Sequence, residues 1–319
     1  MIAATRTGIS EAVEQAVAAL DFGRARTEYW EQNEFICLPR FLPEAVVEAH
    51  LVAQAVRLKS KLNRNYIPGH KKGGSVSYYT VREQAPEFLE LYRSPAFLDF
   101  LSRLVGARLL LCPENDSHAC ALYYYTEPGD HIGFHYDTSY YNGARYTILM
   151  GLVDRSPSCR LVCQLFKGDP TRKMRELQLA TEPGTMVIFN GDKLWHAVTP
   201  LGEGEERIAL TLEYVTNQEM GRLDRLYSNL KDAFGYFGLK ALWGAGSRGV
   251  RGYRGRRRES SSRTSYPSTP VSPYPSTPSL VRELVLQDYV LLHRLFDDGQ
   301  QLILRHRLHQ IVPHPLTHQ

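Results

Sequence analysis

Eight short β-rich segments between residues 107 and 216 constrain the fold of this chain more than any other feature. They are rich in branched and aromatic residues, and Gly, Pro, Asn and Asp residues separate them, as in strands joined by turns. Strands at this density predict an antiparallel sandwich or jelly roll rather than βαβ units. The segments read RLLLCP, ACALYYYT, RYTILMGLVD, CRLVCQLF, RELQLA, GTMVIF, HAVTPL and RIALTLEYVT.

Helical patterns precede these strands. The first 23 residues suit a short amphipathic helix, and residues 44–62 carry apolar side chains at helical spacing. Residues 94–106 form another helical pattern, with Gly106 at its end, and NEFICLPRFLP suits a strand that runs into a turn. We therefore predict an α+β fold in which N-terminal helices flank a β-barrel core at about residues 107–216.

The composition changes abruptly after the predicted domain, residues 1–238. Residues 239–280 are rich in Arg, Gly, Ser and Pro, which predicts a disordered linker, and residues 281–319 suit an amphipathic helical tail. From Lys240 onward 12 basic residues face 5 acidic ones, so the basicity of the chain lies in this region. Its RGRRR run could be a nuclear-import or phosphate-binding patch, but a solvated spacer is the favoured interpretation. No lysine follows Lys240, which fits an appended tail or a different reading frame.

Charge and cysteine usage indicate the expected environment. The chain has a net charge of +4, but its first 239 residues carry −3, so we expect no nucleic-acid partner for the folded domain. No apolar run has the length of a membrane-spanning helix, and the N-terminus lacks a secretory pattern, so we expect no membrane association. The five cysteines are scattered, which predicts reduced thiols in a cytoplasmic protein. Nothing in the sequence indicates the oligomeric state.

The stretch PGDHIGFHYDT holds three candidate metal ligands, His131, His135 and Asp137. Two histidines four residues apart could share a helical face, but Pro128 and the neighbouring glycines disfavour a helix. In an extended segment, side chains two residues apart lie on one side, so His135 and Asp137 converge. We predict these two residues as a ligand pair, with His131 apart from them.

A third ligand and an arginine follow at a suggestive spacing. His196 lies after a strand and a turn, and Arg207 opens the next strand eleven residues later. Two imidazoles and a carboxylate on a β scaffold form the facial triad of non-haem Fe(II) oxygenases, which leaves open coordination positions. Catalytic zinc accepts the same ligands, but a zinc hydrolase has no general need for an arginine that clamps a carboxylate.

The pattern formed by His135, Asp137, His196 and Arg207 resembles the His-x-Asp…His…Arg signature of Fe(II)/2-oxoglutarate-dependent oxygenases. The similarity runs from residue 35 to residue 216, and PGDHIGFHYDTSYYNGARYT is most similar to the small-molecule and free-amino-acid hydroxylases and halogenases. It implies a double-stranded β-helix (jelly-roll or cupin-like) core and Fe(II) bound by the three ligands. It also implies 2-oxoglutarate paired with Arg207, O2 as cosubstrate, and ascorbate as a possible reductant.

The implied reaction is hydroxylation of an unactivated C–H bond, with release of succinate and CO2. Halogenating members carry Gly or Ala in place of the acidic ligand, so Asp137 favours hydroxylation. We expect a small-molecule substrate, with amino acids and amine-bearing metabolites as candidates, and a carrier- or protein-bound substrate stays open. The alternatives are a zinc-dependent hydrolase that uses the same triad and a non-catalytic ligand-binding β-barrel.

Further candidate residues lie on the predicted strands. Alternation along RIALTLEYV places Thr211 and Glu213 on the face that carries the arginine. Glu213 can then bind a cationic group such as an amine, or form a salt bridge at the rim. Thr147 and Tyr123 can hydrogen-bond the cosubstrate, although packing is the usual role of a barrel tyrosine.

Other histidines and one glycine-rich segment complete the candidates. His131 can line the substrate mouth or be merely exposed. The segment GHKKGGSVSYYT, residues 69–80, lacks phosphate-binding spacing and suits a mobile lid over the barrel mouth. His50, His70 and His118 have no metal-like spacing, and we expect them to be structural.

Overall fold

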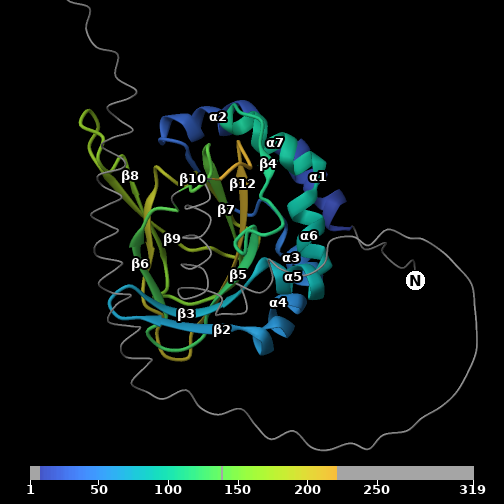
Figure 1. Ribbon diagram of the computed structural model, residues 1–319, viewed down its shortest axis with the longest axis vertical. Helices are drawn as coiled ribbons and strands as arrows, with labels where there is room; N and C mark the ends of the chain where they lie inside the picture. Colours follow the sequence, from blue (N-terminus) through green and yellow to red (C-terminus); the bar gives the residue numbers. More distant parts are fainter. Residues whose placement is uncertain (1–7, 138, 221–319) are drawn as a thin grey trace, which may run out of the picture. The chain divides into compact units, whose positions relative to one another are not determined.

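A computed structural model of the protein describes residues 8–137 and 139–220 (Figure 1). The predicted linker at 239–280 and the predicted helical tail at 281–319 lie outside the described residues, as does the end of the predicted domain. The boundaries of these segments therefore stay predictions.

All described helices lie before residue 106, as the sequence predicts, but the first three strands lie among them. The predicted helix at 44–62 is one helical run that contains a π-helical turn and ends in a 3-10 turn. The predicted helix at 94–106 begins after Ser94, whose side chain accepts a hydrogen bond from the backbone N–H of Phe97. It ends at Gly106, whose φ of 72° is left-handed and therefore favours glycine. The helices are α1 (Ile9–Ala19), α2 (Phe22–Glu31), α3 (Glu44–Val47), η1 (Glu48–Val52), α4 (Ala53–Leu58), η2 (Lys59–Lys61), α5 (Tyr78–Gln84), α6 (Pro86–Arg93) and α7 (Pro95–Val105).

All eight predicted β-rich segments form strands, and the strand predicted near residue 35 also forms. Three further strands, β2, β3 and β6, arise where the sequence pattern is less regular. The strands are β1 (Phe35–Leu38), β2 (Asn63–Ile67), β3 (Lys71–Val76), β4 (Leu110–Leu111), β5 (Cys120–Tyr125), β6 (His131–His135), β7 (Arg145–Arg155), β8 (Leu161–Leu165), β9 (Arg175–Leu179), β10 (Met186–Asn190), β11 (Trp195–Val198) and β12 (Glu206–Val215).

In the described part of the chain the strands form one antiparallel sheet that curls into a half-barrel. Its order is β1-β10-β7-β12-β5-β3-β6-β11-β8-β9, with β2 on β3 and β4 on β12. Neighbours in this order are often distant in sequence, as expected for a jelly-roll-like arrangement rather than a meander. Figure 1 shows α1, α6 and α7 on one side of the sheet, beside β12 and β4, with β6 and β8 lying away from them.

The glycine-rich segment at 69–80 is not a mobile lid, so that prediction was wrong. Most of it is β3, which pairs with β2, β5 and β6 and so joins two parts of the sheet. Gly74 serves close packing, since a Cβ there would lie 3.1 Å from the Leu62 side chain. The end of the segment begins helix α5.

Two groups of buried apolar side chains hold the fold together. The larger lies between the helices and the outer face of β5, β7 and β12, and includes Phe88, Phe97 and Leu210. The smaller comes from strands and the loops that join them and includes Phe189 and Leu149. Because β7 and β12 have cover on both faces, almost every residue along them is buried.

Two global properties of the described residues bear on the setting of the protein. None of their helices combines the length and the apolar composition needed to cross a membrane. The five cysteines all carry free thiols, and four of them are buried.

Candidate functional site

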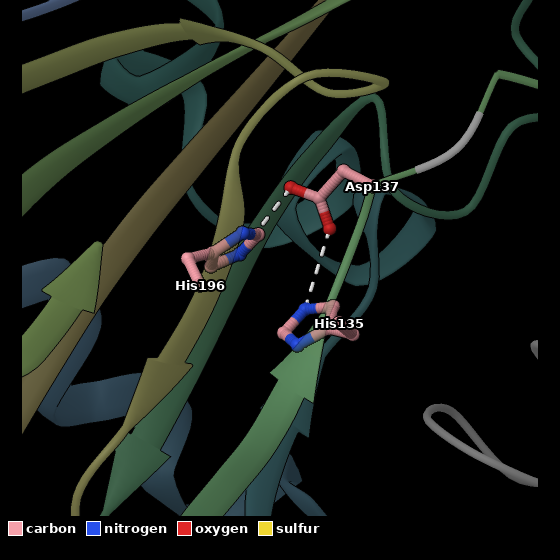
Figure 2. Close-up of side chains that lie close together, drawn as sticks. All are labelled: His135, Asp137 and His196. Carbon is pink, nitrogen blue, oxygen red and sulfur yellow. Dashed lines mark ion pairs between the residues drawn. The ribbon is translucent and has the colours of Figure 1, made fainter. Parts of the chain in front are cut away.

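Two neighbouring strands bring the predicted metal ligands together. Strand β6 ends at His135, and β11 runs antiparallel to it with His196 directly opposite His135. Asp137 follows two residues after the end of β6, where the chain turns toward the same cavity. Figure 2 shows the three side chains pointing toward one another from these elements.

The three side chains are close enough to hold one metal ion. Asp137 Oδ1 lies 3.4 Å from His135 Nε2, and Asp137 Oδ2 lies 3.8 Å from His196 Nε2 (Figure 2). One ligand atom from each residue can be chosen so that all three lie within 4.8 Å of one another. A donor set of two imidazole nitrogens and one carboxylate suits non-haem iron with open positions, and also catalytic zinc.

Backbone carbonyls orient both imidazoles. His135 Nδ1 lies 2.9 Å from the carbonyl oxygen of Gly133, and His196 Nδ1 lies 3.2 Å from that of Leu194. A proton on each Nδ1 can donate to these oxygens, which leaves each Nε2 as a lone-pair donor on the side of Asp137. Burial lowers the pKa of His196 to about 4, with His135 acting in the same direction, so this imidazole is neutral at physiological pH.

Asp137 is held on three sides. Burial alone would raise the pKa of its carboxyl, but the two histidines keep that pKa well below its usual range. Its Oδ2 accepts a hydrogen bond of 2.9 Å from the Thr147 hydroxyl on β7. Gly191 packs against its backbone so closely that a Cβ there would lie 2.3 Å from the Asp137 carbonyl oxygen. The residue after β10 therefore has to be glycine for Asp137 to reach this position.

Arg207, at the start of β12, is one of the most deeply buried side chains, with 1% of it exposed. Its Nε donates a 3.0 Å hydrogen bond to the Thr181 hydroxyl, and its guanidinium carbon lies 5.0 Å from the centre of the Tyr125 ring. Its Nη1 and Nη2 are buried and have no hydrogen-bond partner among the described residues. A buried guanidinium with two unpaired nitrogens calls for an anion, and a carboxylate matches the fork that the nitrogens form.

A cavity opens beside the three candidate ligands. Thr147, Tyr123, Thr211 and Glu213, all predicted as site residues, contribute to its wall. Alternation along β12 therefore places its side chains as the sequence predicts. Arg207 lies outside this wall, farther along the same face of β12.

His131 does not reach the cavity. It is paired with Lys72 on β3, next to Ile132, which does line the cavity, so its own side chain belongs to the opposite face. Its Nδ1 lies 2.8 Å from the carbonyl oxygen of Gly129. The irregular register between β6 and β11 lets both Ile132 and His135 face inward, which simple alternation does not predict.

The remaining histidines differ from one another. His50 lies 3.0 Å from Glu87 on the helical side, which fits a structural role. The ring of His70 lies 6.1 Å from that of His135. His118, expected to be structural, instead lines the cavity, where its Nδ1 lies 2.9 Å from the Tyr123 hydroxyl.

Sequence reasoning missed a buried charged cluster beside Asp137. Arg145 Nε donates to Glu213 Oε2 over 3.0 Å, and Arg145 Nη1 lies 3.4 Å from Asp116 Oδ2. Asp116 also accepts a 2.7 Å hydrogen bond from the Tyr141 hydroxyl. Burial raises the pKa of Glu213 to about 8, although Arg145 acts in the opposite direction. Arg145 lies two residues before Thr147 on one strand, so alternation could have identified it, but the loop residue Asp116 gives no such signal.

The fold recurs in solved structures of iron enzymes, although no protein-family model matches the chain and no curated protein matches its sequence. The non-haem α-ketoglutarate-dependent carbocyclase SnoK from nogalamycin biosynthesis superposes with a TM-score of 0.52 at 16% identity, over 66% of this chain and 92% of that one. The epimerase SnoN, in complex with Fe3+, α-ketoglutarate and nogalamycin RO, gives 0.51 at 16% identity, over 65% and 89%. At such identity the likeness shows the fold, which is that of the Fe/2-oxoglutarate-dependent oxygenases.

Proposed function

We propose that the protein is an Fe(II)- and 2-oxoglutarate-dependent dioxygenase that hydroxylates an unactivated C–H bond of a small molecule. The reaction releases succinate and CO2, and ascorbate serves as an accessory reductant. The curled sheet is then a double-stranded β-helix, and a cytoplasmic location agrees with the free thiols. The observation that carries the proposal is the buried guanidinium of Arg207, whose Nη1 and Nη2 have no partner among the described residues, in a chain that also brings together a His–Asp–His centre.

His135, Asp137 and His196 are the proposed iron ligands. Their Nε2 and carboxylate atoms converge, and the backbone carbonyls behind both imidazoles fix which nitrogen faces the metal. Iron bound there supplies the activation of O2 that no protein side chain can provide. The halogenating members of the family that the chain resembles carry Gly or Ala in place of the acidic metal ligand. Asp137 supplies that carboxylate here, which supports hydroxylation.

Arg207 is the proposed partner of the 2-oxoglutarate C5 carboxylate. Its Nη1 and Nη2 can each donate to one carboxylate oxygen, while Thr181 and Tyr125 hold the rest of the guanidinium in place. Thr147 and Tyr123 line the same cavity as the three proposed metal ligands, where their hydroxyls can contact the cosubstrate. Thr211 and Glu213 are left to contact the substrate.

A zinc hydrolase using the same three ligands is the alternative. It gives no reason for a buried guanidinium with two unpaired nitrogens, because water activation at zinc needs no carboxylate clamp. A non-catalytic barrel gives no reason for two imidazoles oriented toward one carboxylate. Arg207 therefore separates the oxygenase from both alternatives.

The test is conversion of 2-oxoglutarate to succinate by protein purified without oxygen, loaded with Fe(II) and then supplied with O2. A panel of amines, amino acids and related metabolites serves as candidate substrates. Turnover is expected to vanish in His135→Ala and to persist in His50→Gln, which replaces a histidine that does not line the cavity. Tight zinc retention, together with no binding of 2-oxoglutarate, would instead support the hydrolase.

A further inference from the structure

The cavity wall next to Asp137 carries an unbalanced set of charges. Arg145 is the only lysine or arginine of the described chain that lines the cavity. Two carboxylates, Asp116 and Glu213, both contact this one guanidinium. All three side chains are at least nine-tenths buried. A single cation cannot neutralise two buried anions, so one negative charge is left over.

The leftover charge belongs to Glu213, because Asp116 has further support. The Tyr141 hydroxyl and the backbone N–H of His118 donate to Asp116 over 2.7 Å and 2.8 Å. Glu213 faces the cavity, where the Thr147 hydroxyl is the only other group of the described residues that donates to its oxygens.

The Thr147 hydroxyl cannot satisfy Glu213 as well as Asp137. It lies 2.9 Å from Asp137 Oδ2, and 3.2 Å and 3.0 Å from the two oxygens of Glu213, but it has a single proton. When that proton goes to Asp137, Oε1 of Glu213 receives no hydrogen bond from any described residue. A proton on Glu213 then makes up the balance, which agrees with the raised pKa of this buried carboxyl.

We propose that the substrate of this site presents a protonated amine to Glu213 and carries no carboxylate next to that amine. The proposal rests on the proposed function and narrows it. An ammonium group supplies both the missing positive charge and the missing donor to Oε1. Where a substrate brings this cation, it takes the place of the proton that otherwise neutralises Glu213.

The same charges argue against free α-amino acids. An amino acid brings a carboxylate together with its amine, and that carboxylate would need a cation of its own. Arg145 is already shared between Glu213 and Asp116, and the guanidinium of Arg207 lies outside the cavity wall. Binding an α-carboxylate here would add a second uncompensated buried charge, which is costly.

The rest of the cavity wall suits an organic cation. Tyr123, Tyr125, Tyr136 and Tyr140 all contribute to it. Aromatic rings bind the apolar body of an amine and attract its charge through their faces. Phenethylamine is therefore a suitable probe, since it combines an ammonium group with an aromatic ring and has no carboxylate.

The test compares three probes that differ in one group each: phenethylamine, its uncharged N-acetyl derivative, and phenylalanine, which adds a carboxylate. Binding is measured by calorimetry without oxygen on protein loaded with Mn(II) and 2-oxoglutarate. We expect phenethylamine to bind at least about tenfold more tightly than either other probe. In Glu213→Gln the preference over the N-acetyl derivative is expected to disappear, whereas Glu219→Gln, on the exposed chain just after β12, retains it.

The wild-type comparison stands even where a variant fails to fold. Equal binding of the three probes, no binding of any, or tighter binding of phenylalanine would overturn the proposal. Binding of 2-oxoglutarate is measured first in the same experiment. If the protein binds 2-oxoglutarate but does not prefer the amine, the proposed function stands and only the inference about the amine is wrong. If the protein does not bind 2-oxoglutarate, the proposed function is wrong, and the probes then test only whether Glu213 binds an ammonium group.

Discussion

Replacing Arg207 by methionine should stabilise the ligand-free protein while removing its affinity for 2-oxoglutarate. The guanidinium is almost completely buried, and two of its nitrogens have no partner among the described residues. Methionine fills much of the same volume without polar atoms. The substitution therefore separates the cost of Arg207 to folding from its value in binding.

The expected gain in stability follows from the contacts of Arg207. Relief of two unsatisfied buried nitrogens contributes about 4 kcal/mol, at about 2 kcal/mol each. Loss of the Thr181 hydrogen bond costs about 1 kcal/mol, and loss of the contact with the Tyr125 ring costs about 1 kcal/mol. The net increase in the free energy of unfolding is about 2 kcal/mol. For a domain of this size, that raises Tm by about 4–8 °C.

The effect on binding is opposite and larger. Loss of a buried, two-pronged pair with a carboxylate costs about 3–4 kcal/mol, which weakens 2-oxoglutarate about 100- to 1,000-fold. Urea unfolding of the metal-free protein measures the first effect, and calorimetry with Mn(II) in place of Fe(II) measures the second. Arg155→Met, at an exposed arginine on β7, should change neither. A less stable Arg207→Met protein with unchanged 2-oxoglutarate affinity would refute the reasoning.

Three further predictions concern the groups around Asp137. Thr147→Val removes the hydroxyl that donates to Asp137, so Co(II) affinity should fall about 10- to 100-fold. Thr147→Ser keeps the hydroxyl and should keep the affinity. Equal affinities of the two variants would show that this hydrogen bond does not hold Asp137 in place. Gly191→Ala places a Cβ 2.3 Å from the Asp137 carbonyl oxygen, so it should weaken Co(II) binding at least as much as Thr147→Val does. The control Gly23→Ala, in helix α2, should leave Co(II) binding unchanged. Tight Co(II) binding by Gly191→Ala would contradict the close approach of Gly191 to Asp137. Finally, the Glu213 carboxyl is protonated in both the folded and the unfolded chain below its ordinary pKa of 4.5. Between pH 4.5 and the folded-state pKa of about 8, only the unfolded chain releases this proton. As the pH rises through this window, the free energy of unfolding of the metal-free wild type should therefore fall by up to about 5 kcal/mol relative to that of Glu213→Gln. If the unfolding free energies of the two proteins, measured in urea, change in parallel with pH, the prediction is contradicted.

The strands and the convergence of the candidate ligands could be predicted because their signals are local. The segments of the central strands are apolar along almost their whole length, since both faces of β7 and β12 are covered. Alternation was enough to place Thr211 and Glu213 on one wall and to bring His135 and Asp137 together. His196 required only a strand that runs beside β6.

The failures arise where tertiary contacts outweigh local pattern. Glycines in β3 indicate a loop by composition, yet the segment forms a strand because it pairs with β2, β5 and β6, and a Cβ on Gly74 would lie 3.1 Å from the Leu62 side chain. In a regular β6, alternation would place His131 on the same face as His135. The register shift between β6 and β11 instead turns the His131 side chain away from the cavity. The pairing of Arg145 with Asp116 joins a strand to a loop, and no sequence spacing encodes it.

The most direct measurement of the central claim is the fate of labelled oxygen. Fe(II)-loaded protein is supplied with 2-oxoglutarate, the panel of amines, amino acids and related metabolites, and ¹⁸O₂, and the succinate is examined by mass spectrometry. The account predicts succinate that carries a single labelled oxygen atom, and none above background when His135 is replaced by alanine. Unlabelled succinate, or no consumption of 2-oxoglutarate by protein shown to bind Fe(II), would contradict the assignment of this site as an oxygenase centre.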